Sequence, residues 1–186
     1  TILRVEQSRV EADAFIDALR GVEMDPLLHA SSGREVLVGV PRGVSVAALP
    51  GYEEGWFAVQ DPATALSVDL LAPRGGELVL DACAAPGGKT ILMASRMRSG
   101  AGVVAMELHA DRLPKLEANL GRLGFAGVEV VQGDARAPQE ALGDRVFDAI
   151  LLDVPCSNSG VLRRRSDARW RMDADRLKAL NVLQFE

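Results

Sequence analysis

Two segments of the chain contain candidate ligand-binding or catalytic residues, and the first is a loop of small residues. It reads Asp81-Ala-Cys-Ala-Ala-Pro-Gly-Gly-Lys-Thr90 and joins a predicted strand to a predicted helix. Small side chains let a ligand approach the backbone, and the N-terminus of the helix favours electron-rich groups. A phosphate-binding P-loop is excluded, because Cys83 stands where that loop needs a glycine and Pro86 removes an amide donor. The alternative is a tight turn that only packs the helix against the sheet.

The second segment is Asp153-Val-Pro-Cys-Ser-Asn-Ser-Gly160, in which a thiol follows a predicted strand. Carbon 5 of a pyrimidine is a poor nucleophile, so its methylation needs prior attack by a thiolate at carbon 6. Cys156 is therefore a candidate catalytic residue. A buried structural thiol is the alternative interpretation, and it suits Cys83 better.

Carboxylates follow the predicted strands between these segments. Glu107 ends one strand, 26 residues after Asp81. A carboxylate at this position can accept hydrogen bonds from both hydroxyls of a ribose. Asp134 follows the next strand, where an acceptor suits an adenine amino group, and Asp153 follows the fourth. Any one of them alone is better explained as a solvated acid at a loop end. Three of them beside a glycine loop that lacks a phosphate cradle predict S-adenosylmethionine as cofactor.

A basic run follows the thiol segment. From Val161 to Glu186 there are seven Lys or Arg against four Asp or Glu, whereas the whole chain has 21 against 26. Arginines supply phosphate contacts in RNA-binding proteins, so Arg163, Arg164 and Arg165 are predicted to bind RNA. Most charge runs are only solvated faces. Closeness to Cys156 favours substrate contact here.

The elements that must position these residues alternate along the second part of the chain. Four short apolar runs have the texture of parallel strands that are buried on both faces: residues 78–80, 103–105, 128–131 and 149–152. Helical patterns at residues 90–98 and 113–123 lie between them. This alternation predicts a three-layer α/β fold, in which ligands bind at the carboxyl ends of the strands.

The first 60 residues predict a small mixed unit. Strands are expected at residues 3–5, 35–40 and 56–60, and a helix is expected to end at Gly21. From Asp61 the pattern changes, with Asp61 as helix cap and Pro62 in the first turn of a helix that runs to Leu71. We therefore predict two domains, 1–60 and 61–186.

Composition bounds the class of protein. The chain has 186 residues, of which 48% are hydrophobic and 25% charged, so it can bury a core. No apolar run has the roughly 18 to 20 residues of a membrane span, and no signal peptide opens the chain, which favours a cytoplasmic protein. Two cysteines give neither a disulfide framework nor a metal-binding knuckle, so no metal is predicted.

These motifs resemble the RsmB/NOL1/NOP2/Sun family of RNA 5-methylcytosine methyltransferases. The similarity runs from Gly55 to Gln184, and Leu3-Arg4-Val5 resembles the start of the family's RRM-like N-terminal subdomain. The resemblance implies a Rossmann-like methyltransferase sheet, incomplete at its C-terminal strands, after a small RRM-like α+β subdomain. It also implies that S-adenosylmethionine binds Cys83, Ala84, Ala85, Pro86, Gly87, Gly88, Lys89, Glu107, Asp134 and Asp153, with Arg112 a weaker candidate.

The sequence departs from the family pattern in three ways. Glu107 stands where Asp is usual, a tolerable change for binding a diol. Asn158-Ser159 replaces the commoner Gly-Thr, and Ser166 replaces a usual Pro, which changes the loops. The family's nucleophile lies in a Thr-Cys-Ser motif on a later strand, and none occurs before Glu186. By the resemblance, Cys156 is the second cysteine, which assists release of the methylated product.

The function predicted in this way is transfer of a methyl group to carbon 5 of cytosine in RNA, with rRNA or tRNA as partner. Because the Thr-Cys-Ser nucleophile is missing, these 186 residues are expected to be a fragment that binds cofactor poorly and is inactive. Two alternatives stay open. One is a DNA cytosine-5 methyltransferase, whose similar Pro-Cys motif would make Cys156 the nucleophile. The other is a non-catalytic remnant that binds RNA.

Overall fold

The structure is a computed structural model that describes residues 1–29, 35–157, 160, 170 and 173–186. The predicted RNA contacts Arg163, Arg164 and Arg165 lie outside the described residues, as do Asn158-Ser159 and Ser166. The described chain divides into two compact units, Thr1–Leu151 and Leu152–Glu186.

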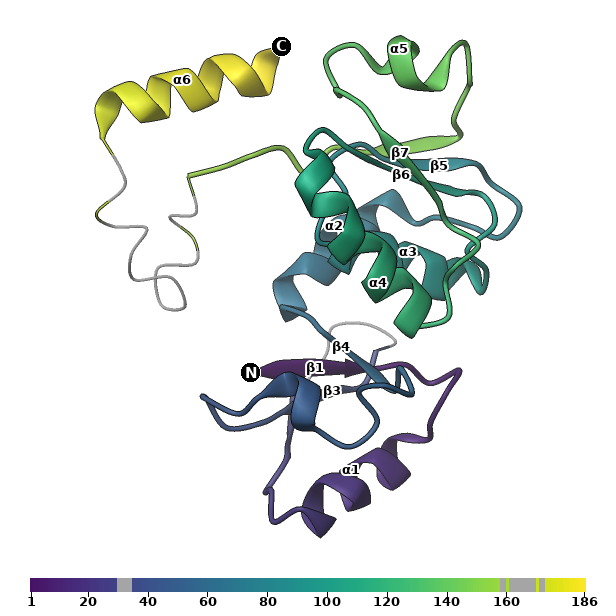
Figure 1. Ribbon diagram of the computed structural model, residues 1–186, viewed down its shortest axis with the longest axis vertical. Coiled ribbons are helices and arrows are strands. Elements are labelled where there is room, and N and C mark those ends of the chain that lie inside the picture. The colour runs from purple at the N-terminus through teal and green to yellow at the C-terminus, as the bar shows by residue number, and fades with distance from the viewer. Residues whose placement is uncertain (30–34, 158–159, 161–169, 171–172) are drawn as a thin grey trace. The chain divides into compact units, whose positions relative to one another are not determined.

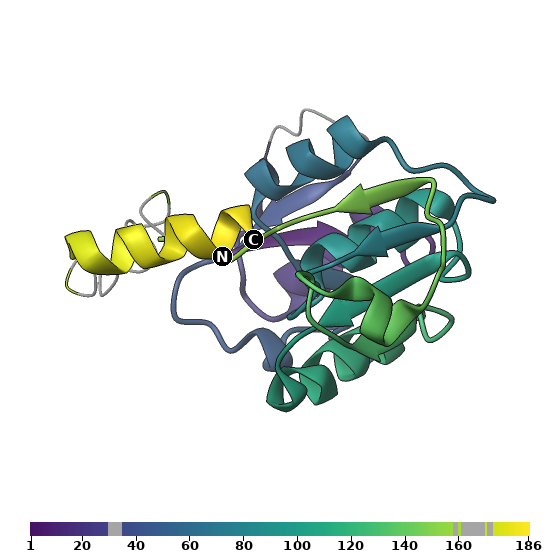
Figure 2. The ribbon, with the colours of Figure 1, turned by 90° about the horizontal axis from the view of Figure 1, so that it is seen from above.

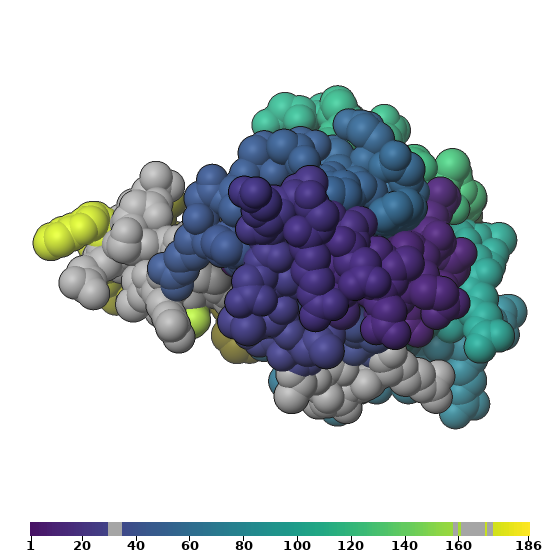
Figure 3. All heavy atoms as spheres, turned by 90° about the horizontal axis from the view of Figure 1, so that it is seen from below, coloured from purple at the N-terminus to yellow at the C-terminus, as the bar shows by residue number. Residues whose placement is uncertain are grey.

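The N-terminal part of the first unit is a four-stranded antiparallel sheet in the order β2-β3-β1-β4 (Figure 1). Its strands are β1 (Ile2–Val5), β2 (Leu27–His29), β3 (Leu37–Gly39) and β4 (Phe57–Val59). Helix α1 (Ala12–Gly21) buries an apolar stripe against one face of the sheet, where the Phe15 and Phe57 rings stack 5.1 Å apart. These N-terminal residues make up most of the surface in Figure 3.

The RRM-like description of this part stays a prediction. That topology would place a second helix between β3 and β4. Those residues instead form the short 3-10 helix η1 (Val46–Ala48) and turns. Strand β2 was not predicted from the sequence, because its three residues are exposed and carry no alternation of apolar and polar side chains.

The second sheet is parallel, with the order β7-β6-β5-β8 (Figure 2). Its strands are β5 (Val79–Asp81), β6 (Val103–Glu107), β7 (Glu129–Gln132) and β8 (Ala149–Leu151). Only β5 and β6 are buried along their whole length. The prediction that all four strands are buried on both faces is therefore wrong for β7 and β8, because most of their residues are half-buried or exposed.

Helices cover this sheet unequally (Figure 1). One face packs against α2 (Ala65–Leu71), α3 (Gly88–Met97) and α4 (Leu113–Arg122), which enclose the larger apolar core. The other face packs against the short helix α5 (Pro138–Leu142), with Leu142 in a smaller core. The predicted three-layer α/β architecture is confirmed. The 3-10 helix η2 (Pro62–Thr64) precedes α2, and Asp61 caps it by accepting the Ala63 amide at 3.0 Å.

Polar contacts join the antiparallel sheet to the helices of the parallel sheet. The buried Arg4–Glu6 ion pair, 3.0 Å between Nη1 and Oε2, extends to α3 because the Ser95 hydroxyl donates to Glu6 at 3.1 Å. Farther along, Arg122 of α4 donates to the carbonyls of Tyr52 and Phe57 at 2.8 and 3.1 Å. Breaking these bonds would leave further polar groups buried without partners, so they favour one orientation of the two sheets.

The second unit contains helix α6 (Ala174–Phe185). Asp173 caps it, with its carboxylate accepting the Arg176 amide at 2.7 Å. The Gln184 side chain donates to the Pro155 carbonyl at 2.7 Å, which ties the end of α6 to the thiol segment. Within the described part of the chain, no helix is long and apolar enough to cross a membrane.

Candidate cofactor site

The predicted loop of small residues connects the end of β5 to the start of α3. The Ala84 amide donates to the Met106 carbonyl at 2.9 Å, which holds the loop against the end of β6. Gly87 has φ +103°, and a Cβ there would lie 2.8 Å from Leu116 Cδ1, so only glycine fits without strain. At Gly88 no atom lies within 4 Å of an added Cβ. The backbone at the start of α3 thus faces open space that a ligand can occupy.

The base of this loop is fixed by a buried hydrogen bond. The Thr90 hydroxyl, on the first turn of α3, donates to Asp81 Oδ2 at 2.7 Å. Both residues are almost completely buried. Because the carboxylate closes a bridge from the strand end to the helix, the loop backbone between them is held in one shape. The sequence contained the signal for this bond, a Thr nine residues after an Asp at a strand end, but the pairing was not predicted.

Glu107 lies at the end of β6, beside this loop. Its carboxylate is buried and accepts hydrogen bonds from the amides of Ala85 at 3.2 Å and His109 at 3.1 Å. Arg112 Nη1 donates to both carboxylate oxygens, at 3.2 and 3.1 Å, and Nη2 donates to the Ala85 carbonyl at 2.6 Å. Two predicted cofactor contacts, Ala85 and Glu107, are therefore in direct contact with each other, and Arg112 touches both.

Asp134 follows β7 at the same edge of the sheet. Glu107 and Gln132 are paired between β6 and β7, and the Gly133 amide donates to the Glu107 carbonyl at 3.1 Å. The Asp134 carboxylate accepts from the Arg136 amide at 3.0 Å and from its guanidinium at 2.6 to 3.1 Å. Arg136 was not predicted as a site residue. An Arg two residues after the Asp was the available signal.

The Arg136 side chain lowers the pKa of the Asp134 carboxyl from 3.8 to about 2, and its backbone amide adds to the effect. A lowered pKa means that the interaction stabilises the fold above about pH 4 and that this contribution is lost as the pH falls toward 2. We expect Arg136→Ala to raise the pKa of the Asp134 carboxyl toward its ordinary value, because the side-chain contact is lost while the backbone amide of residue 136 still donates. In a carboxyl-carbon NMR titration, the midpoint for Asp134 should lie at a clearly higher pH in the variant than in the parent. Equal titration midpoints would contradict the pairing.

Asp153 and Cys156 belong to the second unit, and both are exposed. Exposure leaves the Cys156 thiol accessible to a substrate, whereas Cys83 in the loop is half-buried. The predicted place of Asp153 in the cofactor site stays a prediction, as does the structural role suggested for Cys83. Among the described residues, no cluster of His, Cys, Asp and Glu side chains has the arrangement of a metal site.

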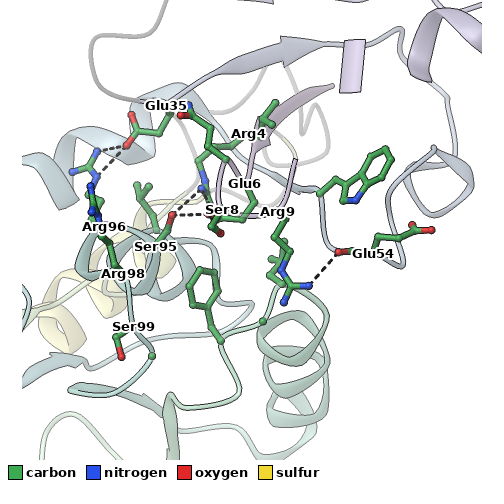
Figure 4. Close-up of a pocket in the computed structure, with 18 residues that line it drawn as sticks. Arg4, Glu6, Ser8, Arg9, Glu35, Glu54, Ser95, Arg96, Arg98 and Ser99 are labelled. Atoms are coloured by element: carbon green, nitrogen blue, oxygen red, sulfur yellow. Dashed lines mark hydrogen bonds and ion pairs between the residues drawn. The ribbon is translucent and has the colours of Figure 1, made fainter. Parts of the chain in front are cut away.

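A separate open pocket of about 1040 Å³ lies between the antiparallel sheet and α3 (Figure 4). None of the predicted cofactor residues lines it. The dashed contacts in Figure 4 include the Arg96–Glu35 ion pair, 2.6 Å between Nη2 and Oε1, and the bonds of Arg4, Glu6 and Ser95. Its lining comes from the antiparallel sheet and its loops, from α3 and from the turn after α4, so the pocket lies at the contact between the two sheets.

The fold is the Rossmann-like fold of S-adenosylmethionine-dependent methyltransferases. Its features are the parallel sheet, the glycine loop and the acids at the ends of β6 and β7. Among solved structures, PH0851 is similar over 98% of this chain and 41% of its own, with a TM-score of 0.88 and 28% identity. NSun6 from Pyrococcus horikoshii, solved with SFG, has a TM-score of 0.72 and 20% identity, and covers 84% of this chain and 63% of its own. The second likeness is evidence for the fold alone.

The profile of the 16S rRNA methyltransferase RsmB/F family matches residues 68–186. The chain belongs to this family. It is 41% identical over 184 residues to ribosomal RNA small subunit methyltransferase B of Vibrio vulnificus, a match that covers 99% of this chain and 42% of that protein. The protein of that name from Pseudomonas syringae pv. tomato is 38% identical, and this match covers 100% of this chain and 41% of that protein. The chain thus spans about two fifths of the length of these relatives.

Proposed function

We propose that this chain forms the cofactor-binding part of an enzyme that methylates carbon 5 of cytosine in RNA, with rRNA or tRNA as substrate. The observation that carries the proposal is the contact of the small-residue loop with Glu107 at the carboxyl end of the parallel sheet. The family's name and the order of the motifs also support it. A cytoplasmic location belongs to the same proposal.

The residues present fit S-adenosylmethionine. The loop from Cys83 to Lys89 offers close backbone approach at Gly88, where nothing obstructs an added atom. Glu107 offers a buried carboxylate as an acceptor for hydroxyl donors, and Asp134 offers a second acceptor on the neighbouring strand end. When bound, the cofactor supplies the methyl group on an electrophilic sulfonium. Asp153 would complete the acceptor set.

The remaining chemistry falls to the second unit. Methylation at carbon 5 needs a thiolate bonded to carbon 6, and the product leaves only after the carbon 5 proton is removed and that bond is broken. By the family resemblance, Cys156 assists this release, and its exposure allows contact with the base. Arg163, Arg164 and Arg165 are proposed to contact RNA phosphates near the target.

In a protein that carries this chain together with the family's Thr-Cys-Ser motif, Glu107→Ala is expected to weaken binding of S-adenosylmethionine. Loss of hydrogen bonds to a charged acceptor costs roughly 1.5 to 3 kcal/mol, about tenfold or more in affinity. Isothermal titration calorimetry measures the change. Glu117→Ala, an exposed acid on α4, is the matched control and should bind like the parent. Unchanged affinity in Glu107→Ala would remove Glu107 from the cofactor site.

The reaction itself is tested on a protein that carries this chain together with the family's Thr-Cys-Ser motif, with methyl-labelled S-adenosylmethionine and 16S rRNA, followed by digestion to nucleosides. The proposal expects the label in 5-methylcytidine. Label in another nucleoside would contradict cytosine carbon 5 as the acceptor. Transfer to DNA in preference to RNA would favour a DNA cytosine-5 methyltransferase, and RNA binding without transfer would favour a non-catalytic role.

A further inference from the structure

The Glu107 carboxylate has no acceptor position to spare. A carboxylate offers about four lone-pair positions, two on each oxygen. Oε1 accepts from the His109 amide and Arg112 Nη1, and Oε2 accepts from the Ala85 amide and the same Nη1. All four positions are in use. Any further donor, such as the pair of hydroxyls on a ribose, must therefore replace one of these contacts.

The four contacts differ in how easily they can be given up. Both amides belong to backbone that is fixed at the strand end and in the loop. Arg112 contributes a side chain that is 46% exposed, and its two contacts with Glu107 share one nitrogen at 3.1 and 3.2 Å. Both distances exceed the roughly 2.7 to 2.9 Å of a strong charged hydrogen bond, so each contact is weaker than one of these. The Arg112 contacts are the ones that can be displaced.

The position of Arg112 Nη1 is also informative. Nearly equal distances to both oxygens place this nitrogen close to the bisector of the carboxylate. A vicinal diol that donates one hydroxyl to each oxygen approaches along the same direction. We propose that Arg112 Nη1 occupies the position of the ribose hydroxyls when no cofactor is bound, and that it moves away from Glu107 when an adenosine-type cofactor binds. This inference rests on the function proposed above.

A second contact of Arg112 would keep its side chain on the loop after it leaves Glu107. Its Nη2 donates to the Ala85 carbonyl at 2.6 Å, a contact that does not involve Glu107. Rotation about that contact can free the carboxylate while Arg112 stays on the loop. The arginine thus acts as a positioning residue: it keeps the Glu107 oxygens aimed outward and satisfied until the cofactor's hydroxyls arrive.

If Arg112 competes with the cofactor's hydroxyls for Glu107, removing its side chain should tighten binding of the cofactor. The parent for these tests is a protein that carries this chain together with the family's Thr-Cys-Ser motif. We expect Arg112→Ala in it to bind S-adenosylhomocysteine about three- to tenfold more tightly, which corresponds to the modest stabilisation from a half-exposed ion pair. Binding of the 2′,3′-dideoxy analogue should not tighten, because it has no hydroxyls to replace Nη1. Lys115→Ala, which removes an exposed cation from the first turn of α4, is the control for charge and should bind like the parent. Weakened or unchanged binding by Arg112→Ala would overturn the proposal.

A double-mutant cycle on unfolding stability tests the same idea without relying on affinity. Arg112→Ala and Glu107→Gln should be coupled in the empty protein, and the coupling should disappear with saturating S-adenosylhomocysteine. Coupling that persists in the bound protein would overturn displacement while leaving the proposed function intact. Failure of the parent to bind S-adenosylhomocysteine would refute the cofactor proposal. In that case, absence of coupling in the empty protein would also refute the place of Arg112 on Glu107.

Discussion

Gly55→Ala is expected to lower the free energy of unfolding by on the order of 3 kcal/mol. Gly55 has φ +70°, a left-handed conformation that costs an alanine about 1 to 2 kcal/mol. The added Cβ would also overlap the Arg122 carbonyl oxygen at the end of α4 and lie 3.2 Å from Leu123 Cα. These are backbone atoms, so no side chain can rotate away to make room. The chain must move where the antiparallel sheet meets α4.

Gly76→Ala is the matched control for this experiment. Gly76 has φ +92°, but nothing lies within 4 Å of an added Cβ, so only the backbone cost applies. Urea unfolding at 25 °C should show Gly55→Ala losing clearly more stability than Gly76→Ala. Equal losses would mean that the chain accommodates the added Cβ at Gly55 without the cost expected from its overlap with the end of α4.

Cys156→Ala is expected to stall the enzyme on its RNA, in a protein that carries this chain together with the family's Thr-Cys-Ser motif. The other thiol would still add to carbon 6 and the base would still be methylated. Release would then lack its assisting group, and loss of such proton-transfer help slows a step by roughly 10² to 10⁴-fold. On denaturing gels with S-adenosylmethionine and RNA, the variant should accumulate a covalent adduct that the parent shows only transiently.

The 186-residue chain by itself is the control for the role of Cys156. Without the Thr-Cys-Ser nucleophile, it should form no adduct, with or without the substitution. An adduct from this chain that disappears in Cys156→Ala would make Cys156 the attacking thiol. That outcome would overturn its assignment to product release and would favour the mechanism of the DNA cytosine-5 methyltransferases.

Patterns within a few neighbouring residues were enough to predict much of this protein. The apolar runs at β5 and β6, the glycines that open α3 and the Asp61-Pro62 cap are local signals, and the structure has an element at each. The short helix α5 was not predicted. Its five residues are too few to show a helical period.

The tertiary structure decided which side chains touch and which strands are exposed. Sequence predicted that Glu107 and Asp134 follow strands, but pairing of β6 with β7 in the observed register brings them to one edge. Strand β8 has an apolar sequence, and β7 has two valines between Glu129 and Gln132; the strand order shows that both flank the described sheet. The arginine contacts of Glu107 depend on how η3 (Ala110–Arg112) turns back onto the loop after β5. The Arg112 contact with the Ala85 carbonyl joins residues that are 27 positions apart in the chain, so local periodicity carries no record of it.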